Sequence, residues 1–372
     1  MSPDFGKALE LTRDLPETAS NLTRVSKEVG SELARQAFAQ WGLRRRASTK
    51  FLKALEMLFE GEALEQATHE KVAAYHAGLF PKGCAVIDLT CGIGADTIAL
   101  AGRGPVSAFE LDGARLEFAR HNLGVYDRTA ELHLADAMGR LRELVDGYVY
   151  ADPSRRVGGR RTLDPGDFSP DPVEVARLGG RQRLCVIKLS PLLSDEFLEG
   201  LGVRVEFVSF GRECREALVF TGREAVPGRV AVHVESGELL PAGEVPPVTE
   251  VPGAFLFDVD PAAVRAHALG VLCRTHGMCG LADSGGYLAG PEPVSSPWMR
   301  GYRVLYEGPG DVKRTKAELR RLGSGTPILK QRGTGLDLDA LRKQFKLEGS
   351  WARLVAIYPR GRGIRHVVME EI

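Results

Sequence analysis

Apolar residues follow a helical spacing in the first part of the chain and a strand-like spacing after it. Over residues 1–80 they recur every three or four positions, whereas over 81–222 short apolar runs alternate with helical stretches. The first pattern predicts a small helical domain and the second an α/β domain built on a parallel sheet. Residues 223–252, rich in Gly, Pro, Val and Glu, predict a linker or short hairpin, and 253–372 predict a third unit of helices and strands.

Apolar spacing and capping residues give the elements expected in each region. The helical domain should contain helices at 26–41, at 51–58 behind Ser48 and Thr49, and at 69–80 behind Thr68. The α/β domain should contain seven strands, the last two antiparallel, at 86–89, 106–110, 132–136, 148–151, 184–189, 203–210 and 216–220, with helices at 96–102, 112–124 and 139–144. The third unit should contain helices at 261–270, 312–322 and 337–345 and strands at 303–306, 326–330 and 351–358.

The run from Val86 to Asp96 is typical of a strand, a glycine turn and the start of a helix. Gly92 and Gly94 permit a tight turn with close backbone approach, and such a turn at the carboxyl edge of a parallel sheet binds a ligand. Because Asp88 precedes the glycines and Thr97 stands where a dinucleotide-binding turn has its third glycine, a pyrophosphate is disfavoured. An uncharged ribose or a cationic amino-acid head group fits better.

Two later strands also end in acids. Glu110 lies 18 positions after Gly92, where a carboxylate can hold both ribose hydroxyls, and Asp136 is suitably placed for an adenine amino group. Three acidic strand ends with this turn resemble the class I S-adenosylmethionine-dependent methyltransferases. The alternative is an ordinary nucleotide-binding α/β fold or a chance glycine turn.

This resemblance implies a Rossmann-like α/β domain with a seven-stranded sheet and S-adenosyl-L-methionine as the cofactor. The residues implied to bind the cofactor are Gln66, Thr68, Asp88, Thr90, Gly92, Gly94, Asp96, Thr97, Glu110, Leu111, Asp136 and Ala137.

The segment after the fourth strand should lie beside the cofactor turn, which makes Asp152, Pro153, Ser154 and Arg155 the candidate reaction site. Methyltransferases that act on a nucleobase amine carry Asp, Asn or Ser, then two prolines and an aromatic, and these groups orient the amine and stack on the base. Here Ser154 replaces the second proline and Arg155 the aromatic, and an Arg plane can also stack on a base. The alternative is that the segment caps a turn. Gly158-Gly159, between arginine pairs, suggests a mobile basic lip.

Charge is balanced overall, with 49 basic and 49 acidic side chains, but it is segregated along the chain. Residues 24–53 carry eight cations against two acids, and 311–366 carry fourteen against five. Such segregation favours a polyanion over a solvated surface as its explanation. The candidate RNA contacts are Arg44, Arg45, Arg46, Lys50, Arg156, Lys188, Lys330 and Arg332.

Several classes of protein are disfavoured by composition. No apolar run reaches the ~18 residues of a membrane span, and Met1 to Phe5 lack a basic and apolar leader, so we expect a cytoplasmic protein. The six cysteines show no paired spacing, which favours reduced thiols. His267, Cys273, His276 and Cys279 lack the paired signature of a structural zinc site, so we expect no metal.

Two narrower family resemblances rest on short motifs. Residues 64–152 are similar to the trimethylguanosine synthase branch of RNA methyltransferases, through 66–68, 91–97 and 119–122, although Arg155 stands where that branch has a cap-stacking tryptophan. Over its full length the chain resembles a bacterial family of class I methyltransferases with a C-terminal THUMP-like domain, and THUMP domains are associated with RNA binding. The motifs that carry this second likeness are 43–47, 152–156, 330–333 and 337–339.

Together these features predict a methyltransferase that acts on a base nitrogen of structured RNA, either tRNA or rRNA. Two alternatives remain: a non-catalytic RNA-binding protein that binds S-adenosylmethionine, and a methyltransferase acting on a small molecule or protein. The sequence does not name the target nucleotide.

Overall fold

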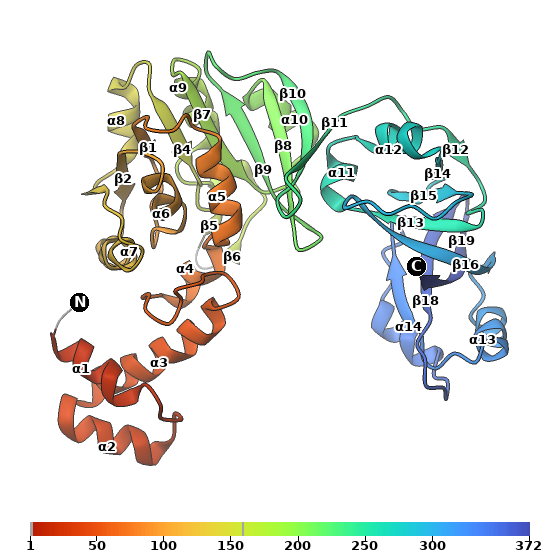
Figure 1. The fold of residues 1–372 in the computed structure, drawn as a ribbon, viewed down its shortest axis with the longest axis horizontal. Helices are drawn as coiled ribbons and strands as arrows, with labels where there is room; N and C mark the ends of the chain where they lie inside the picture. The colour runs from red at the N-terminus through yellow and green to blue at the C-terminus, as the bar shows by residue number, and fades with distance from the viewer. Residues whose placement is uncertain (1–2, 158–159) are drawn as a thin grey trace. The chain divides into compact units, whose positions relative to one another are not determined.

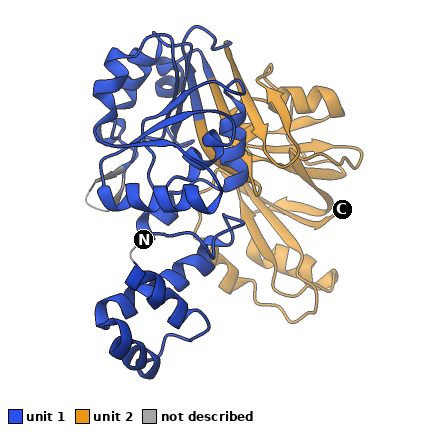
Figure 2. Ribbon diagram, turned by 60° about the vertical axis from the view of Figure 1, so that its left-hand side comes forward, with its two compact units in different colours: residues 1–204, 218–226 blue, residues 205–217, 227–372 orange. Residues whose placement is uncertain are grey.

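The computed structural model describes residues 3–157 and 160–372 and divides the chain into two compact units. Unit 1 comprises residues 1–204 and 218–226, and unit 2 comprises 205–217 and 227–372 (Figure 2). The boundary passes through strand β9 (Glu213–Thr221), whose first residues belong to unit 2 and whose last residues belong to unit 1. The two units therefore alternate along the sequence.

Unit 1 begins with helices, as the apolar spacing predicted. They are α1 (Pro3–Thr12), α2 (Ala19–Val29), α3 (Ser31–Ala47), α4 (Gly61–Gln66) and α5 (Glu70–Gly78). The single helix expected at 26–41 is two helices, because the backbone at Gly30 has a φ of 85° and ends α2. The expected cap of the last helix was also wrong. His69, not Thr68, caps α5 by accepting a hydrogen bond from the backbone N–H of Lys71.

The helix predicted over 51–58 is absent, and the segment forms turns instead. Its backbone N–H groups donate to side chains outside the segment: that of Leu52 to Glu70 and that of Leu58 to Asn122. These tertiary hydrogen bonds replace the local ones of a helix. The segment is nevertheless anchored, because Phe51 and Met57 are buried against Ile93 of the glycine turn.

The expected parallel arrangement is confirmed for β7, β4, β1, β2 and β3, but the sheet has nine strands rather than the expected seven, in the order β11-β10-β8-β9-β7-β4-β1-β2-β3. Strand β1 pairs in parallel with both β2 and β4, and the β2–β3 and β4–β7 pairs are parallel as well. The strands are β1 (Val86–Asp88), β2 (Val106–Glu110), β3 (Glu131–Leu134), β4 (Tyr148–Ala151) and β7 (Leu184–Leu189), and β9 contributes residues 218–221. The helices between them are α6 (Ala95–Ala101), α7 (Gly113–Val125), α8 (Ala137–Glu143), α9 (Pro172–Gly179) and α10 (Asp195–Leu201) (Figure 1).

A small antiparallel pair, β5 (Arg156–Val157) and β6 (Arg160–Arg161), follows β4, and a 3-10 turn spans Pro165–Asp167. The basic lip expected at Gly158-Gly159 lies outside the described residues.

Unit 2 contains two groups of strands. The first has the order β11-β10-β8-β9, from β8 (Arg204–Phe210, with residues 205–210 in this unit), β10 (Gly228–His233) and β11 (Glu238–Pro241). The second has the order β12-β14-β15-β13-β16-β19-β18-β17. Its strands are β12 (Val248–Thr249), β13 (Phe255–Val259), β14 (Cys279–Leu281), β15 (Tyr287–Gly290), β16 (Met299–Pro309), β17 (Ile328–Gln331), β18 (Leu354–Arg360) and β19 (Gly363–Glu371).

The helices of unit 2 are α11 (Pro261–Arg265), α12 (Leu269–His276), α13 (Val312–Arg321) and α14 (Leu338–Gln344). The helix expected at 261–270 is divided into α11 and α12, because His267 has a φ of 58°. Helices α13 and α14 cover one face of the sheet, where Leu319 and Phe345 pack with Val355, Ile357 and Val368. Both helices therefore turn their polar sides away from this core.

Candidate cofactor and reaction site

The glycine turn after β1 is built by its two glycines and by Asp88. The φ values of Gly92 and Gly94 are 55° and 89°, in the region that favours glycine. A Cβ atom on Gly94 would lie 3.3 Å from Ala119 on α7, so the turn also needs the space that glycine leaves. The Asp88 carboxylate is fully buried and accepts hydrogen bonds from the Thr97 hydroxyl (2.6 Å) and the Thr90 N–H (3.0 Å). Asp88 thus holds the turn from inside.

Burial raises the pKa of Asp88 to about 7, although the hydrogen bonds from Thr97 and Thr90 act in the opposite direction. Asp96 lies nearby at the start of α6 and is also buried. Burial works against its ionisation, but the charge and hydrogen bond of His76, together with Lys188 and Thr68, hold the pKa of Asp96 at about 2. The two carboxyl groups therefore differ in charge near neutral pH.

The two other acidic strand ends lie at the carboxyl edge of the same sheet. Glu110 accepts hydrogen bonds from the backbone N–H groups of Gly92 (2.9 Å), Leu111 (2.8 Å) and Asp112 (2.9 Å). Its carboxylate is thereby fixed beside the turn. Asp136 is exposed and caps α8 through the Met138 N–H (2.9 Å), while Ala137 is buried.

Two exposed leucines stand next to these acids. Leu111, which follows Glu110, is 68% exposed, and Leu134, which closes β3 two residues before Asp136, is 61% exposed. A Cβ atom on Gly113 would lie 3.7 Å from the Leu134 side chain, so that leucine covers the start of α7. Apolar side chains beside carboxylates suit a ring that has flat faces and polar edges, such as adenine. The residues present therefore fit S-adenosylmethionine. Leu134 is an addition to the predicted set, and only its place at the end of an apolar strand could have indicated it.

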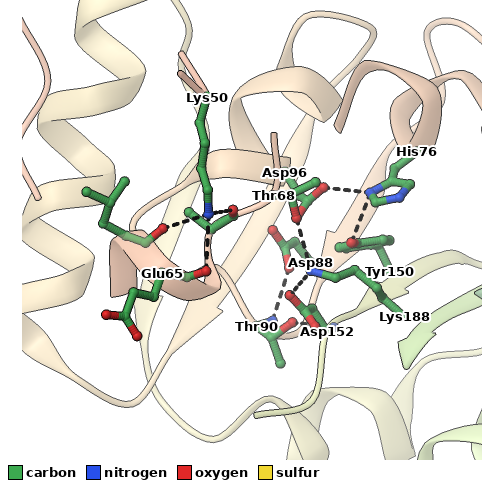
Figure 3. A network of polar contacts seen from close by, with 12 residues as sticks. Lys50, Glu65, Thr68, His76, Asp88, Thr90, Asp96, Tyr150, Asp152 and Lys188 are labelled. Carbon is green, nitrogen blue, oxygen red and sulfur yellow. Dashed lines mark hydrogen bonds and ion pairs between the residues drawn. The ribbon is translucent and has the colours of Figure 1, made fainter. Parts of the chain in front are cut away.

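A chain of polar contacts joins the candidate reaction site to the interior of unit 1 (Figure 3). The Lys188 ammonium on β7 forms an ion pair with the Asp152 carboxylate and donates to the Thr68 hydroxyl (3.0 Å). Thr68 in turn donates to Asp96 (2.7 Å). The network therefore links strands β4 and β7 with the segment before α5.

The network continues at His76, whose Nδ1 atom lies 2.7 Å from Asp96 Oδ1 and 3.2 Å from the Tyr150 hydroxyl. His76 and Tyr150 are fully buried. Sequence reasoning missed both residues, because a histidine within a helix and a tyrosine within an apolar strand have the pattern of ordinary core residues. Thr68 and Asp96 were predicted to bind the cofactor, and the structure connects them to Lys188 and His76. Gln66, from the same set, donates to Glu62 at 3.1 Å.

The backbone around Asp152 is fixed by its neighbours. The Asp152 N–H donates to the Thr90 hydroxyl (2.6 Å), which joins the end of β4 to the glycine turn. Pro153 is buried, and Ser154 forms an antiparallel bridge with Ser169 through hydrogen bonds of 2.7 and 3.0 Å. The Arg155 carbonyl accepts from the Thr162 N–H (2.9 Å). Asp152 is thus brought together with Lys188 and Thr90, whereas the side chain of Arg156 lies outside the description.

Five of the cations expected to contact RNA bind groups within the protein, so this expectation is not supported for them; one of the five is Lys188, which pairs with Asp152. Arg44 is 5% exposed, donates to the Met57 carbonyl (2.8 Å) and stacks over Trp41. Burial lowers its pKa to about 10. Lys50 donates to the carbonyls of Leu64, Glu65 and Ala67 at 2.8, 3.1 and 2.7 Å (Figure 3).

Lys330 and Arg332 both pair with Asp258, at 3.1 and 2.7 Å. Lys330 and Arg332 therefore take part in ion pairs within unit 2. Arg45 and Arg46 are exposed, as an RNA contact requires, and Arg46 lies 3.8 Å from Glu65.

Exposed cations gather instead on α13, on α14 and just after α14. We call this group the basic helical face; it consists of Lys313, Arg314, Arg320, Arg342, Lys343 and Lys346. Among the described residues these six side chains form no ion pair, and the Lys316 ammonium donates to the Gln344 carbonyl (3.2 Å), joining the two helices. Such a surface is typical of a polyanion site.

The described ranges, 3–157 and 160–372, contain no group of three or more His, Cys, Asp and Glu residues that could hold a metal ion. No helix within them is long and apolar enough to cross a membrane.

Residues 299–370 match the family model described as "THUMP domain-like". The chain is 34% identical over 342 residues to uncharacterized S-adenosylmethionine-dependent methyltransferases from two strains of Mycobacterium tuberculosis, CDC 1551 and H37Rv, and the match covers 87% of this chain and 93% of each relative. A crystal structure of a protein from Porphyromonas gingivalis W83, provisionally described as a methyltransferase, has the same fold, with a TM-score of 0.80, 18% identity and 99% of both chains covered. The resemblance of residues 64–152 to trimethylguanosine synthases stays a prediction.

Proposed function

The chain belongs to the S-adenosylmethionine-dependent methyltransferases, and from this premise we propose that it methylates a base nitrogen of a structured RNA, either tRNA or rRNA. The observation that carries the choice of RNA is the basic helical face, which lies within the THUMP-like region. Six exposed cations without ion pairs among the described residues suit the phosphates of a nucleic acid, because each bound phosphate releases counterions. A small-molecule substrate would give no reason for this surface.

The carboxyl edge of unit 1 supplies the groups that would hold the cofactor. We assign the ribose hydroxyls to Glu110, the adenine amino group to Asp136, and the faces of the adenine ring to Leu111 and Leu134. Asp88 and Gly94 act indirectly, because they shape the turn. When bound, S-adenosylmethionine supplies an electrophilic methyl group on a sulfonium, and transfer to nitrogen is a direct displacement.

Asp152 is the residue that we propose to orient the target nitrogen. Its carboxylate and the Pro153 carbonyl would accept hydrogen bonds from the nitrogen and so aim its lone pair at the methyl group. The Lys188 ion pair holds that carboxylate in a fixed position, and the Thr90 hydroxyl fixes its backbone. Arg155 follows at the point where the base would stack.

The proposal is tested by substituting Asp152. The variant Asp152→Ala should bind S-adenosylmethionine with nearly unchanged affinity in calorimetry, and should lose transfer of labelled methyl to total RNA from cells that lack this protein. Asp14→Ala is a matched control, because Asp14 is an exposed aspartate distant in sequence from the site. Normal RNA methylation by Asp152→Ala would refute the site assignment.

The acceptor class needs a separate experiment. Single-turnover transfer to RNA distinguishes an enzyme acting on RNA from a protein that only binds it, and mass spectrometry of nucleosides from cells with and without the protein identifies the methylated base. RNA affinity that does not change with salt, together with methyl transfer to protein or small molecules in a cell extract, would contradict the proposal.

A further inference from the structure

One tryptophan of unit 2 is exposed to an unusual degree. The chain has three tryptophans, and Trp41 and Trp298 are only 7% and 3% exposed, whereas Trp351 is 76% exposed. Trp351 lies in the loop between α14 and β18. An exposed indole ring offers a large flat apolar surface to water, so it indicates a binding surface more strongly than an exposed aliphatic residue does.

The backbone that carries this ring is held firmly. The Trp351 carbonyl accepts hydrogen bonds from the Gly325 N–H (2.8 Å) and the Ser324 hydroxyl (3.3 Å), and a parallel bridge joins Ser324 and Trp351. The loop between α13 and β17, which contains Ser324 and Gly325, closely approaches the loop of Trp351. A Cβ atom on Gly325 would lie 2.4 Å from the Gly349 carbonyl oxygen. A ligand that contacts the ring therefore meets a backbone that is already ordered, which lowers the entropy cost of binding.

Cations of the basic helical face flank this pair of loops. Arg320 lies in the last turn of α13, just before the loop that contains Ser324, and Lys346 lies in the same loop as Trp351. Glu348 is the exposed acid of this loop, and the nearby Glu318 is already paired with Arg321. The helix ends that lead into these two loops are therefore predominantly basic.

We propose that Trp351 stacks on an unpaired base of RNA while Arg320 and Lys346 contact the adjacent phosphates. The inference rests on the proposed function in that it takes the substrate to be RNA, and it adds that recognition includes a single-stranded nucleotide. A flat ring beside cations matches the design of sites for single-stranded nucleic acid. Bases within a duplex are already stacked on one another, so a duplex offers this ring no free face.

The experiment uses the full chain and the intrinsic fluorescence of its exposed tryptophan. A short oligouridine should quench the emission on titration, and the same RNA annealed to its complement should quench it far less at equal phosphate concentration. Trp351→Ala should bind the oligouridine, measured by anisotropy of a labelled strand, on the order of ten- to a hundredfold more weakly, whereas Trp351→Phe should retain most of the affinity. Val251→Ala is the control, because Val251 is also exposed (54%) in unit 2 and should bind normally.

Equal affinity of Trp351→Ala and the unaltered protein for the oligouridine would overturn the inference. Equal loss of binding to single-stranded and duplex RNA would overturn it too, because stacking on an unpaired base would not explain the loss. If anionic lipid vesicles quench the tryptophan emission and RNA does not, the inference is overturned, because the ring would then bind a membrane surface. If the oligouridine binds through Trp351 but no RNA is methylated, the stacking site stands and the proposed function fails.

Discussion

Lys188 is the side chain on which the geometry of the reaction site depends most directly. Its ammonium lies between the Asp152 carboxylate and the Thr68 hydroxyl. Sequence reasoning placed Lys188 on the correct strand but assigned it to a phosphate or base, because a cation near a cofactor turn gives no sign of its partner. Only the fold reveals the ion pair, which joins positions 36 residues apart.

We expect Lys188→Met to lower kcat by about 10- to 100-fold, because a misplaced Asp152 would no longer align the target nitrogen. The KM for S-adenosylmethionine should change little. The measurement is steady-state kinetics with RNA, which separates the effect on kcat from the effect on the KM values. Lys188→Arg keeps the charge and should restore part of the rate. Equal rates in Lys188→Met and the unaltered enzyme would exclude the positioning role.

The buried carboxyl group of Asp88 leads to a second prediction, which concerns how the stability of the protein depends on pH. Its folded-state pKa of about 7 lies above that of an unfolded aspartate, so the folded state binds the proton more tightly. The resulting contribution to stability is fully present below about pH 4 and is lost as the pH rises to about 7, at about 1.4 kcal/mol per pKa unit at most. Asp88→Asn removes this dependence.

The check for Asp88 is the free energy of unfolding by urea between pH 4 and 7. The stability of the unaltered protein relative to Asp88→Asn should fall across this range. Asp96 does not interfere, because its lowered pKa of about 2 places its own loss of stability below pH 4, as the pH falls. A constant difference between the two proteins from pH 4 to 7 would show that Asp88 is not protonated in the folded state.

At the scale of the element, the glycine turn and α7 fit together only without a side chain at Gly94. Gly94→Ala would bring a Cβ atom to 3.3 Å from Ala119 at a φ of 89°. We expect a loss of about 1–3 kcal/mol in stability and weaker cofactor binding, measured by urea unfolding and calorimetry. Gly139→Ala in α8 is the matched control, because its Cβ meets no atom within 4 Å and its φ is not positive. That control should be neutral or slightly stabilising.

The elements differ in how far the sequence predicted them. The strand at 184–189 and the helix at 112–124 were predicted to within one residue, because apolar runs and an Asp cap mark them locally. The helix predicted at 51–58 was wrong. Its apolar residues do have helical spacing, but two of its backbone N–H groups donate to the side chains of Glu70 and Asn122 instead of to carbonyls within a helix. Strands β13, β15 and β19 were missed, because short apolar runs alone do not identify a strand, even where its partner is adjacent in the sequence, as β18 is to β19.

In the candidate site, too, residues with a local signal in the sequence were predicted and residues defined by tertiary contacts were not. Asp88, Glu110 and Asp152 could be predicted because each closes an apolar strand, and parallel strands bring their ends to one edge. Arg44 and Lys50 could not be judged from sequence, since a cation that binds backbone carbonyls has the same composition signal as one that binds a phosphate.

For the whole molecule, the basic helical face predicts how RNA affinity depends on salt. The double variant Lys313→Ala/Arg342→Ala should weaken RNA binding and reduce the slope of log affinity against log salt by about 1 to 2, because up to two phosphate contacts are lost. Affinity for S-adenosylmethionine should stay the same. Filter binding at several salt concentrations measures the slope, and Lys82→Ala serves as the control, since Lys82 is exposed in unit 1. An unchanged slope would show that RNA binds elsewhere.

The path of the chain between its units has a consequence for how the molecule can be divided. Residues 205–217 belong to unit 2, yet residues 218–226 return to unit 1 before unit 2 continues at 227. No single peptide bond therefore separates the units. A C-terminal fragment that begins at 227 lacks most of β8 and the start of β9, and an N-terminal fragment that ends at 204 lacks the rest of β9. Limited proteolysis or truncation at 204 or 227 would thus break strands, whereas residues 242–247, between β11 and β12, lie outside the strands of both large sheets, so a fragment that carries the THUMP-like part alone is best begun there.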